Sequence, residues 1–128
     1  MNDEIVADAS AILAALKSEP FTKFDPTRLV RATVSTVNMC EVLSKLHDDG
    51  LTPAQADAAA ARLELEVVAF DMVQAAVAAE LRLKTRSRGL SLADRACLAL
   101  GDQLGCAVVT ADRAWAKLHV GVEVILIR

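Results

Sequence analysis

The sequence predicts an α/β protein built on a mainly parallel sheet of five strands flanked by helices. Short apolar runs alternate along the chain with segments in which apolar residues recur at helical spacing, a pattern typical of crossover connections. The composition is 54% hydrophobic but only 3% aromatic, which favours closely packed alanine-rich helices over an all-β sandwich. A length of 128 residues suits one domain with a sizeable core, and we expect a single domain over residues 1–128.

The first half of the chain predicts three strands and three helices. Apolar residues 5–7 form the first strand, and the helix that follows ends before Pro20, because proline disfavours helix in the residue preceding it. A β-branched run forms the second strand, and the next helix stops at Gly50. Thr52-Pro53 opens a third helix, since proline is tolerated in a first turn. The remaining ranges are 9–16, 36–47 and 54–63 for the helices and 32–35 and 65–70 for the strands.

The second half predicts two long helices, two strands and a short helix between the strands. An alanine-rich helix covers 71–85, and a second one covers 91–104 and closes at Gly105. The strands follow at 107–110 and 122–127, on either side of a short helix at 112–118.

Charge and cysteine content narrow the class of protein. A net charge of −3 and a pI near 5.3 argue against a general nucleic-acid coat, which depends on positive surface. The first ten residues are acidic and lack the pattern of a signal peptide. Every charge-free stretch is far shorter than the roughly 20 residues of a membrane span. Three scattered cysteines form neither a disulfide framework nor a metal motif, so we expect a cytoplasmic protein with no membrane association.

Four carboxylates stand at positions where α/β proteins place their ligand sites. Asp8 and Asp112 directly follow predicted strands, Glu41 lies in the second turn of a helix, and Asp94 lies in the first turn of another. Ligands bind beyond the carboxyl ends of parallel strands. Each residue also has a structural explanation, because aspartates commonly cap helices and Ser91-x-x-Asp94 has capping-box spacing.

Of the four carboxylates, Asp94 fits the role of a simple helix cap least well. Its neighbours at helical spacing form an almost wholly apolar stripe of Leu90, Cys97, Leu98 and Gly101. A carboxylate there is partly desolvated, which costs free energy unless it is paired or binds a cation. Converging carboxylates raise one another's pKa, and a divalent cation relieves that repulsion. Oxygen ligands without histidine or cysteine favour Mg²⁺ or Mn²⁺ over zinc.

Around these carboxylates the chain resembles the PIN-domain ribonucleases, and among them the toxins of VapBC-type toxin–antitoxin pairs. The matching segments, in order, are VADAS, STVNMCEVLSKL, GLSLADRACLALGDQLG and VVTADRAW. The resemblance implies a five-stranded parallel sheet and an acidic site that binds Mg²⁺ or Mn²⁺ and hydrolyses RNA. It implies that Asp8, Glu41, Asp94 and Asp112 are the catalytic and metal-binding residues, with Thr110 auxiliary near the metal. It also implies a homodimer and a cognate antitoxin that covers the site.

An acidic site repels RNA, so affinity must come from cations elsewhere. A basic block of Arg82, Lys84, Arg86 and Arg88 precedes the Asp94 helix, and clustered cations are the usual footprint of phosphate binding. Arg95 and Arg113, each adjacent to a proposed ligand, are further candidates for RNA phosphate. The alternative for the block is a solvated helix end, where cations suit the helix dipole.

Two other functions remain open from the sequence. A phosphoacceptor receiver domain would use Asp71 and Thr110, but Ala7 and Ala9 flank Asp8 where a second acidic residue is required. A non-catalytic PIN-like binding module would have lost one or more acidic ligands, and all four are present. We therefore rank the ribonuclease first.

Overall fold

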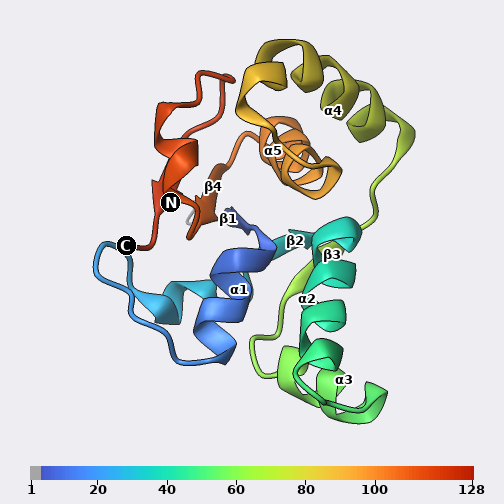
Figure 1. Ribbon diagram of the computed structural model, residues 1–128, viewed down its shortest axis with the longest axis vertical. Helices are drawn as coiled ribbons and strands as arrows, with labels where there is room; N and C mark the ends of the chain where they lie inside the picture. Colours follow the sequence, from blue (N-terminus) through green and yellow to red (C-terminus); the bar gives the residue numbers. More distant parts are fainter. Residues whose placement is uncertain (1–3) are drawn as a thin grey trace.

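Residues 4–128, the part of the chain that the computed structural model describes, are arranged around a five-stranded parallel sheet in the order β3-β2-β1-β4-β5 (Figure 1). The strands are β1 (Ile5–Ala7), β2 (Thr33–Ser35), β3 (Glu66–Val68), β4 (Ala107–Thr110) and β5 (Val124–Leu126). Because all pairings are parallel, the carboxyl ends of the strands meet at one edge. The α/β class and the five-stranded parallel sheet are confirmed.

Helices cover both faces of the sheet (Figure 1). The α-helices are α1 (Ala9–Leu16), α2 (Thr36–Asp48), α3 (Pro53–Ala61), α4 (Met72–Thr85) and α5 (Leu92–Leu104). The short 3-10 helices are η1 (Pro26–Leu29), η2 (Arg86–Arg88) and η3 (Arg113–Lys117). None of the helices within residues 4–128 has the length and apolar character needed to cross a membrane.

The sheet divides the core into two layers. Ile5 and Ala7 pack on the face covered by α1, α2 and α3. Val6, between them, packs on the face covered by α4 and α5. β1 is therefore buried on both faces, which is why it reads as a continuous apolar run rather than an alternating one.

The structure differs from the predicted elements in detail. The segment 112–118 forms the 3-10 helix η3 rather than an α-helix, and the last strand is only Val124–Leu126. The helices η1 and η2 were not predicted, because four and three residues are too few to show a periodicity. α3 begins one residue early, at Pro53, because Thr52 and Gln55 form a reciprocal capping box.

Gly101 lets α5 lie against the sheet. A Cβ atom on Gly101 would meet Cγ2 of Val108 at 2.5 Å and Cγ1 of Val122 at 3.3 Å. Both neighbours are short β-branched side chains that cannot swing away easily. The missing side chain is therefore what allows the helix that carries Asp94 to approach β4.

We expect Gly101→Val to lower the free energy of unfolding by about 1–3 kcal/mol, the usual cost of overpacking a core. Urea unfolding would measure the change. The control is Asp102→Val, which puts the same side chain on the exposed neighbouring position and is expected to change stability by only about 0.5 kcal/mol. Equal losses in the two variants would contradict the close-approach explanation.

Candidate functional site

The four predicted carboxylates line one pocket at the carboxyl edge of the sheet. Asp8 ends β1 and caps α1, Glu41 lies on α2, and Asp94 lies in the first turn of α5. Asp112 follows β4 and caps η3. The pocket has a volume of about 160 Å³, and its lining is Asp8, Ala9, Ser10, Leu13, Glu41, Lys45, Asp94 and Asp112. The structure thus brings together residues as far apart in the sequence as Asp8 and Asp112.

Asp8 is the buried centre of this pocket, with 5% of its surface exposed. Its carboxylate accepts hydrogen bonds from the Ser10 hydroxyl at 2.7 Å, the Ala11 amide at 2.9 Å and the Thr110 hydroxyl at 2.6 Å. Burial raises the pKa of Asp8 to about 6, and the charge of Asp94 adds to the rise, although the three hydrogen bonds oppose it. Asp8 therefore carries a costly negative charge above that pH.

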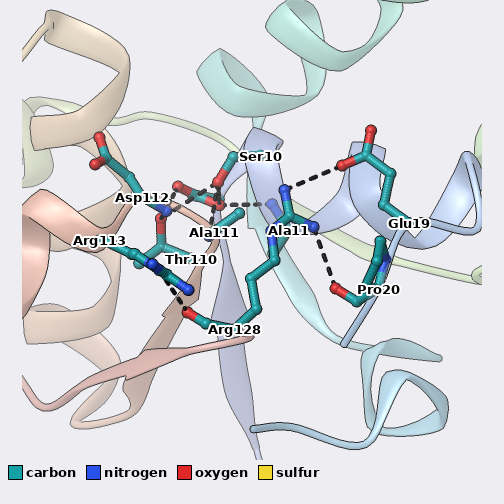
Figure 2. A network of polar contacts seen from close by, with 10 residues as sticks. Ser10, Ala11, Glu19, Pro20, Thr110, Ala111, Asp112, Arg113 and Arg128 are labelled. Carbon is teal, nitrogen blue, oxygen red and sulfur yellow. Dashed lines mark hydrogen bonds and ion pairs between the residues drawn. The ribbon is translucent and has the colours of Figure 1, made fainter. Parts of the chain in front are cut away.

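Thr110 and Ser10 join the ends of β1 and β4 (Figure 2). The Thr110 hydroxyl accepts a hydrogen bond from the Asp112 amide at 3.0 Å, besides donating to Asp8. The Ser10 hydroxyl accepts one from the Ala111 amide at 2.9 Å, besides donating to Asp8. Both hydroxyl groups thus fix the orientation of the Asp8 carboxylate.

Thr110 lies beside the acidic pocket, as the resemblance implied. Ser10, which also lines the acidic pocket, was not predicted from the sequence as a member of the site. Its only signal is the Asp-x-Ser spacing at the start of α1, which also occurs in ordinary helix caps.

Glu41 and Asp94 face each other from α2 and α5. Partial burial raises the pKa of Glu41, the Asp94 charge raises it further, and Lys45 opposes the rise. Asp94 also forms the predicted capping box, in which its Oδ2 accepts a hydrogen bond from the Ser91 amide at 2.9 Å. Asp94 is consequently both a cap and a member of the acidic pocket.

The buried thiol of Cys97 is influenced by three of these charges. Its pKa is raised well above the ordinary value, first by burial and then by the charges of Asp8, Asp94 and Glu41. From the sequence, helix capping and membership of the acidic pocket were alternative roles for Asp94, and in the structure it has both.

Asp112 is less closely coupled to the other three. Its side chain is exposed, and its Oδ1 accepts a hydrogen bond from the Ala114 amide at 2.9 Å. Figure 2 shows its carboxylate pointing away from Ser10 and Thr110. The charge of Asp112 is not among the causes that raise the pKa of Asp8 or Glu41. Asp112 therefore lies at the rim of the pocket.

The donor set of the pocket fits a hard divalent cation. The ion pairs within residues 4–128 are Lys17–Asp49, Arg31–Glu64 and Arg128–Glu19, and none of them neutralises a pocket carboxylate. No three Asp, Glu, His or Cys side chains in this part of the chain stand ready to hold one ion. Mg²⁺ usually takes one or two carboxylates and keeps several water molecules. Asp8, Glu41 and Asp94 would therefore hold an ion partly through water.

The predicted phosphate-binding cations other than Arg95 occupy three different environments. Arg82 and Arg86 line a second pocket of about 160 Å³ at the end of α4. Lys84 and Arg88 are exposed near it but do not line it, and they do not share an α-helical face because the α-helix ends at Thr85. Arg113 is exposed, and its Nε donates a hydrogen bond to the Arg128 carbonyl oxygen at 3.4 Å.

The prediction that Arg95 binds phosphate is wrong. Arg95 is buried between α4 and α5, and its Nη1 donates a hydrogen bond to the Ala78 carbonyl oxygen at 2.9 Å. It follows Asp94 in sequence but points in a different direction from α5, because successive helix residues are about 100° apart. Its guanidinium group ties α5 to α4.

The receiver alternative does not agree with the sheet order. Asp71 would have to lie beside Asp8 to act as a phosphoacceptor, but it follows the edge strand β3, which β2 separates from β1. Its Oδ1 accepts a hydrogen bond from the Gln74 amide at 2.8 Å, so it caps α4. Asp71 is absent from the lining of the acidic pocket.

A parallel α/β sheet with a pocket beyond the carboxyl ends of its central strands belongs to the class of open α/β domains that bind ligands at this edge. Within that class, the family model of the PIN domain matches residues 5–120. The chain belongs to the PIN-domain family. No curated protein matches the sequence significantly.

Solved structures with the same fold include chains from toxin–antitoxin complexes and a chain described as a toxin. A Rickettsia felis VapBC2 complex with promoter DNA gives a TM-score of 0.76 at 13% identity, over 97% of this chain and 98% of that one. A Klebsiella pneumoniae toxin–antitoxin complex gives 0.71 at 13% identity, over 98% of both chains. The Mycobacterium tuberculosis toxin VapC20, described as cleaving the sarcin-ricin loop, gives 0.67 at 19% identity, over 94% and 99%.

Proposed function

We propose that this chain is a Mg²⁺- or Mn²⁺-dependent endoribonuclease, and that it is the toxin of a toxin–antitoxin pair. The observation that carries the proposal is the acidic pocket, where Asp8 is buried beside Asp94 and Glu41. Lys45 also lines this pocket, but no salt bridge among residues 4–128 includes any of the three carboxylates. Such a cluster is unfavourable for the folded protein by itself and becomes favourable when a divalent cation binds. The membership of the PIN-domain family supports the same chemistry.

The side chains divide the work between holding an ion and positioning water. A bound divalent ion lowers the pKa of a water molecule and neutralises charge that develops on the phosphate. Ser10 and Thr110 keep the Asp8 carboxylate oriented, and Ser91 does the same for Asp94. Asp112, at the rim, orients the attacking water or holds a second ion. In-line attack by water then leaves a 5′-phosphate and a 3′-hydroxyl.

The proposed partners follow from the pocket and the fold. Two of the similar structures are toxin–antitoxin complexes, and we propose a cognate antitoxin for this chain. A lysine or arginine of the antitoxin that enters the acidic pocket would satisfy the carboxylates as an ion does. We also propose a homodimer, and a location in the reducing cytoplasm, in keeping with three free cysteines.

Cleavage of total cellular RNA by the antitoxin-free protein tests the proposal. The reaction is run with Mg²⁺, with Mn²⁺ and with a chelator, and the ends of the products are mapped. We expect discrete metal-dependent cuts with 5′-phosphate ends for the wild type, and none for Asp94→Asn. The asparagine still caps α5, since its side-chain oxygen can accept the Ser91 amide hydrogen bond.

The matched control is Asp102→Asn, which removes an exposed carboxylate from the last turn of the same helix. It is expected to cleave as the wild type does. Loss of cleavage in both variants, or cleavage that persists in the chelator, would contradict the proposal. If Mg²⁺ raises the melting temperature of the wild type but no RNA is cut, the chain is a non-catalytic PIN-like module instead.

A further inference from the structure

A cationic pocket lies beside the helix that carries Asp94 and shares none of its lining with the acidic pocket. Its lining is Arg82, Thr85, Arg86, Gly89 and Leu90, and its volume is about 160 Å³. A single water molecule needs only about 10–15 Å³ of such a volume. The pocket is therefore large enough for a polyatomic ligand.

The path of the chain forms the walls of this pocket. Arg82 and Thr85 stand on the last turn of α4, and Arg86 opens the tighter helix η2. Thr85 is buried, and its hydroxyl donates a hydrogen bond to the Leu81 carbonyl oxygen at 2.7 Å. Gly89 has a φ of 65°, a left-handed conformation that turns the chain back. The turn places Leu90 against the same pocket as the two arginines.

A helix-end role alone does not account for the two arginines. Cations near the end of a helix interact well with its dipole, but Arg82 and Arg86 line the same pocket, where their like charges repel. No ion pair within residues 4–128 includes either side chain. The two guanidinium groups thus share a pocket without a neutralising carboxylate, and an anion would relieve their repulsion.

The chemistry of the pocket selects a phosphate group. Guanidinium groups form bidentate, charge-assisted hydrogen bonds to phosphate oxygens. Leu90 lines the cationic pocket and Asp94, four residues further along the chain, lines the acidic pocket. Between them, the Ser91 amide donates a hydrogen bond to Asp94 Oδ2 at 2.9 Å.

We propose that this pocket binds one backbone phosphodiester of single-stranded RNA, away from the phosphate that is cut. The inference rests on the proposed function for the identity of the ligand, and it adds a second contact that fixes how the strand lies across the acidic pocket. Arg82 and Arg86 are the binding residues, and the turn at Gly89 holds them next to Leu90.

The first test uses inorganic phosphate and does not depend on nuclease activity. The melting temperature of the full chain is measured in a chelator over a phosphate titration. We expect phosphate to stabilise the wild type and to have no such effect on the double variant Arg82→Gln/Arg86→Gln. The control double variant Lys84→Gln/Arg88→Gln loses the same charge from the same segment, outside the pocket, and is expected to respond as the wild type does.

The second test measures the affinity for a fluorescent single-stranded RNA in the chelator, where no metal-dependent cleavage occurs. Arg82→Gln/Arg86→Gln is expected to weaken binding at least about tenfold. Its slope of log K against log salt should be shallower by about 0.7, the value for one lost phosphate contact on a single strand. Lys84→Gln/Arg88→Gln is expected to stay within about threefold of the wild type, since neither side chain lines the pocket.

If the two double variants weaken RNA binding equally, phosphate binding in the cationic pocket is contradicted, and only a general effect of positive charge is left. Stronger binding of duplex DNA than of single-stranded RNA would contradict the identification of single-stranded RNA as the ligand. If these binding results hold while total RNA remains uncut, the cationic pocket stands and the proposed nuclease fails.

Discussion

Asp8→Asn is expected to lower RNA cleavage by about 10²- to 10³-fold or more, the range for removing one preorganised electrostatic contact to a transition state. Asp8 is the most buried of the four carboxylates, and three donors hold it in place. Asparagine keeps the size of the side chain and can still cap α1 through the Ala11 amide, but it cannot carry the negative charge that a cation requires. Initial rates on a cleavable RNA, measured with saturating Mg²⁺, would give the effect.

Asp71→Asn is the matched control for this variant. Asp71 caps α4 through an amide three residues ahead, as Asp8 caps α1, but it lies after β3 and outside the acidic pocket. It is expected to retain wild-type activity. If the two variants lose activity equally, the loss comes from helix capping and Asp8 is not a metal ligand.

The second large effect concerns stability without metal. The pKa of Asp8 is raised to about 6 in the folded protein, from 3.8 for an ordinary aspartate. A raised pKa means that the folded state binds the proton more tightly than the unfolded state does. The contribution of Asp8 is fully present below about pH 4 and is lost as the pH rises through about 6. The lost stability amounts to about 3 kcal/mol above pH 7, at about 1.4 kcal/mol for each pKa unit.

The pH profile of the Asp8→Asn variant should therefore diverge from that of the wild type. In a chelator, the stability of the variant relative to the wild type is expected to increase by about 3 kcal/mol between pH 4 and pH 7.5. Urea unfolding at a series of pH values would measure this change. Adding Mg²⁺ at pH 7.5 should stabilise the wild type and leave the variant almost unchanged, since binding to the folded state stabilises it. Parallel profiles in the chelator would show that Asp8 pays no cost for its burial.

Much of the acidic pocket could be predicted because its residues are tied to the ends of regular elements. Asp8 and Asp112 follow apolar strands, and parallel strands end at one edge, so their proximity follows from the fold class. Glu41 and Asp94 were candidates by position, and the resemblance to a family grouped them with Asp8 and Asp112, because a carboxylate on a helix does not show in sequence which neighbour its helix faces. The structure supplies that information through the packing of α2 on α5, where the side-chain Nδ2 of Asn38 donates a hydrogen bond to the Ala93 carbonyl oxygen at 3.0 Å.

The errors have physical causes as well. Arg95 was assigned to the surface because of its neighbour Asp94, yet residues 95–101 are all buried. Arg95 lies on the side of α5 that packs on α4, where its guanidinium group reaches the Ala78 carbonyl oxygen. Ser10 was missed because its importance comes from the Ala111 amide, which lies a hundred residues away. Contacts of this kind appear only when the fold brings two strand ends together.

The hydrogen bond between Asp8 and Thr110 has a consequence for the synthesis of the chain. It joins residues 102 positions apart, and ribosomes add about 5–20 residues per second. About 5–20 s therefore pass between the synthesis of Asp8 and that of Thr110. During this time the pocket lacks the end of β4 and the residues that follow it. The growing chain cannot assemble the pocket until synthesis has passed residue 110. The proposed endoribonuclease activity would therefore be absent from all shorter nascent chains.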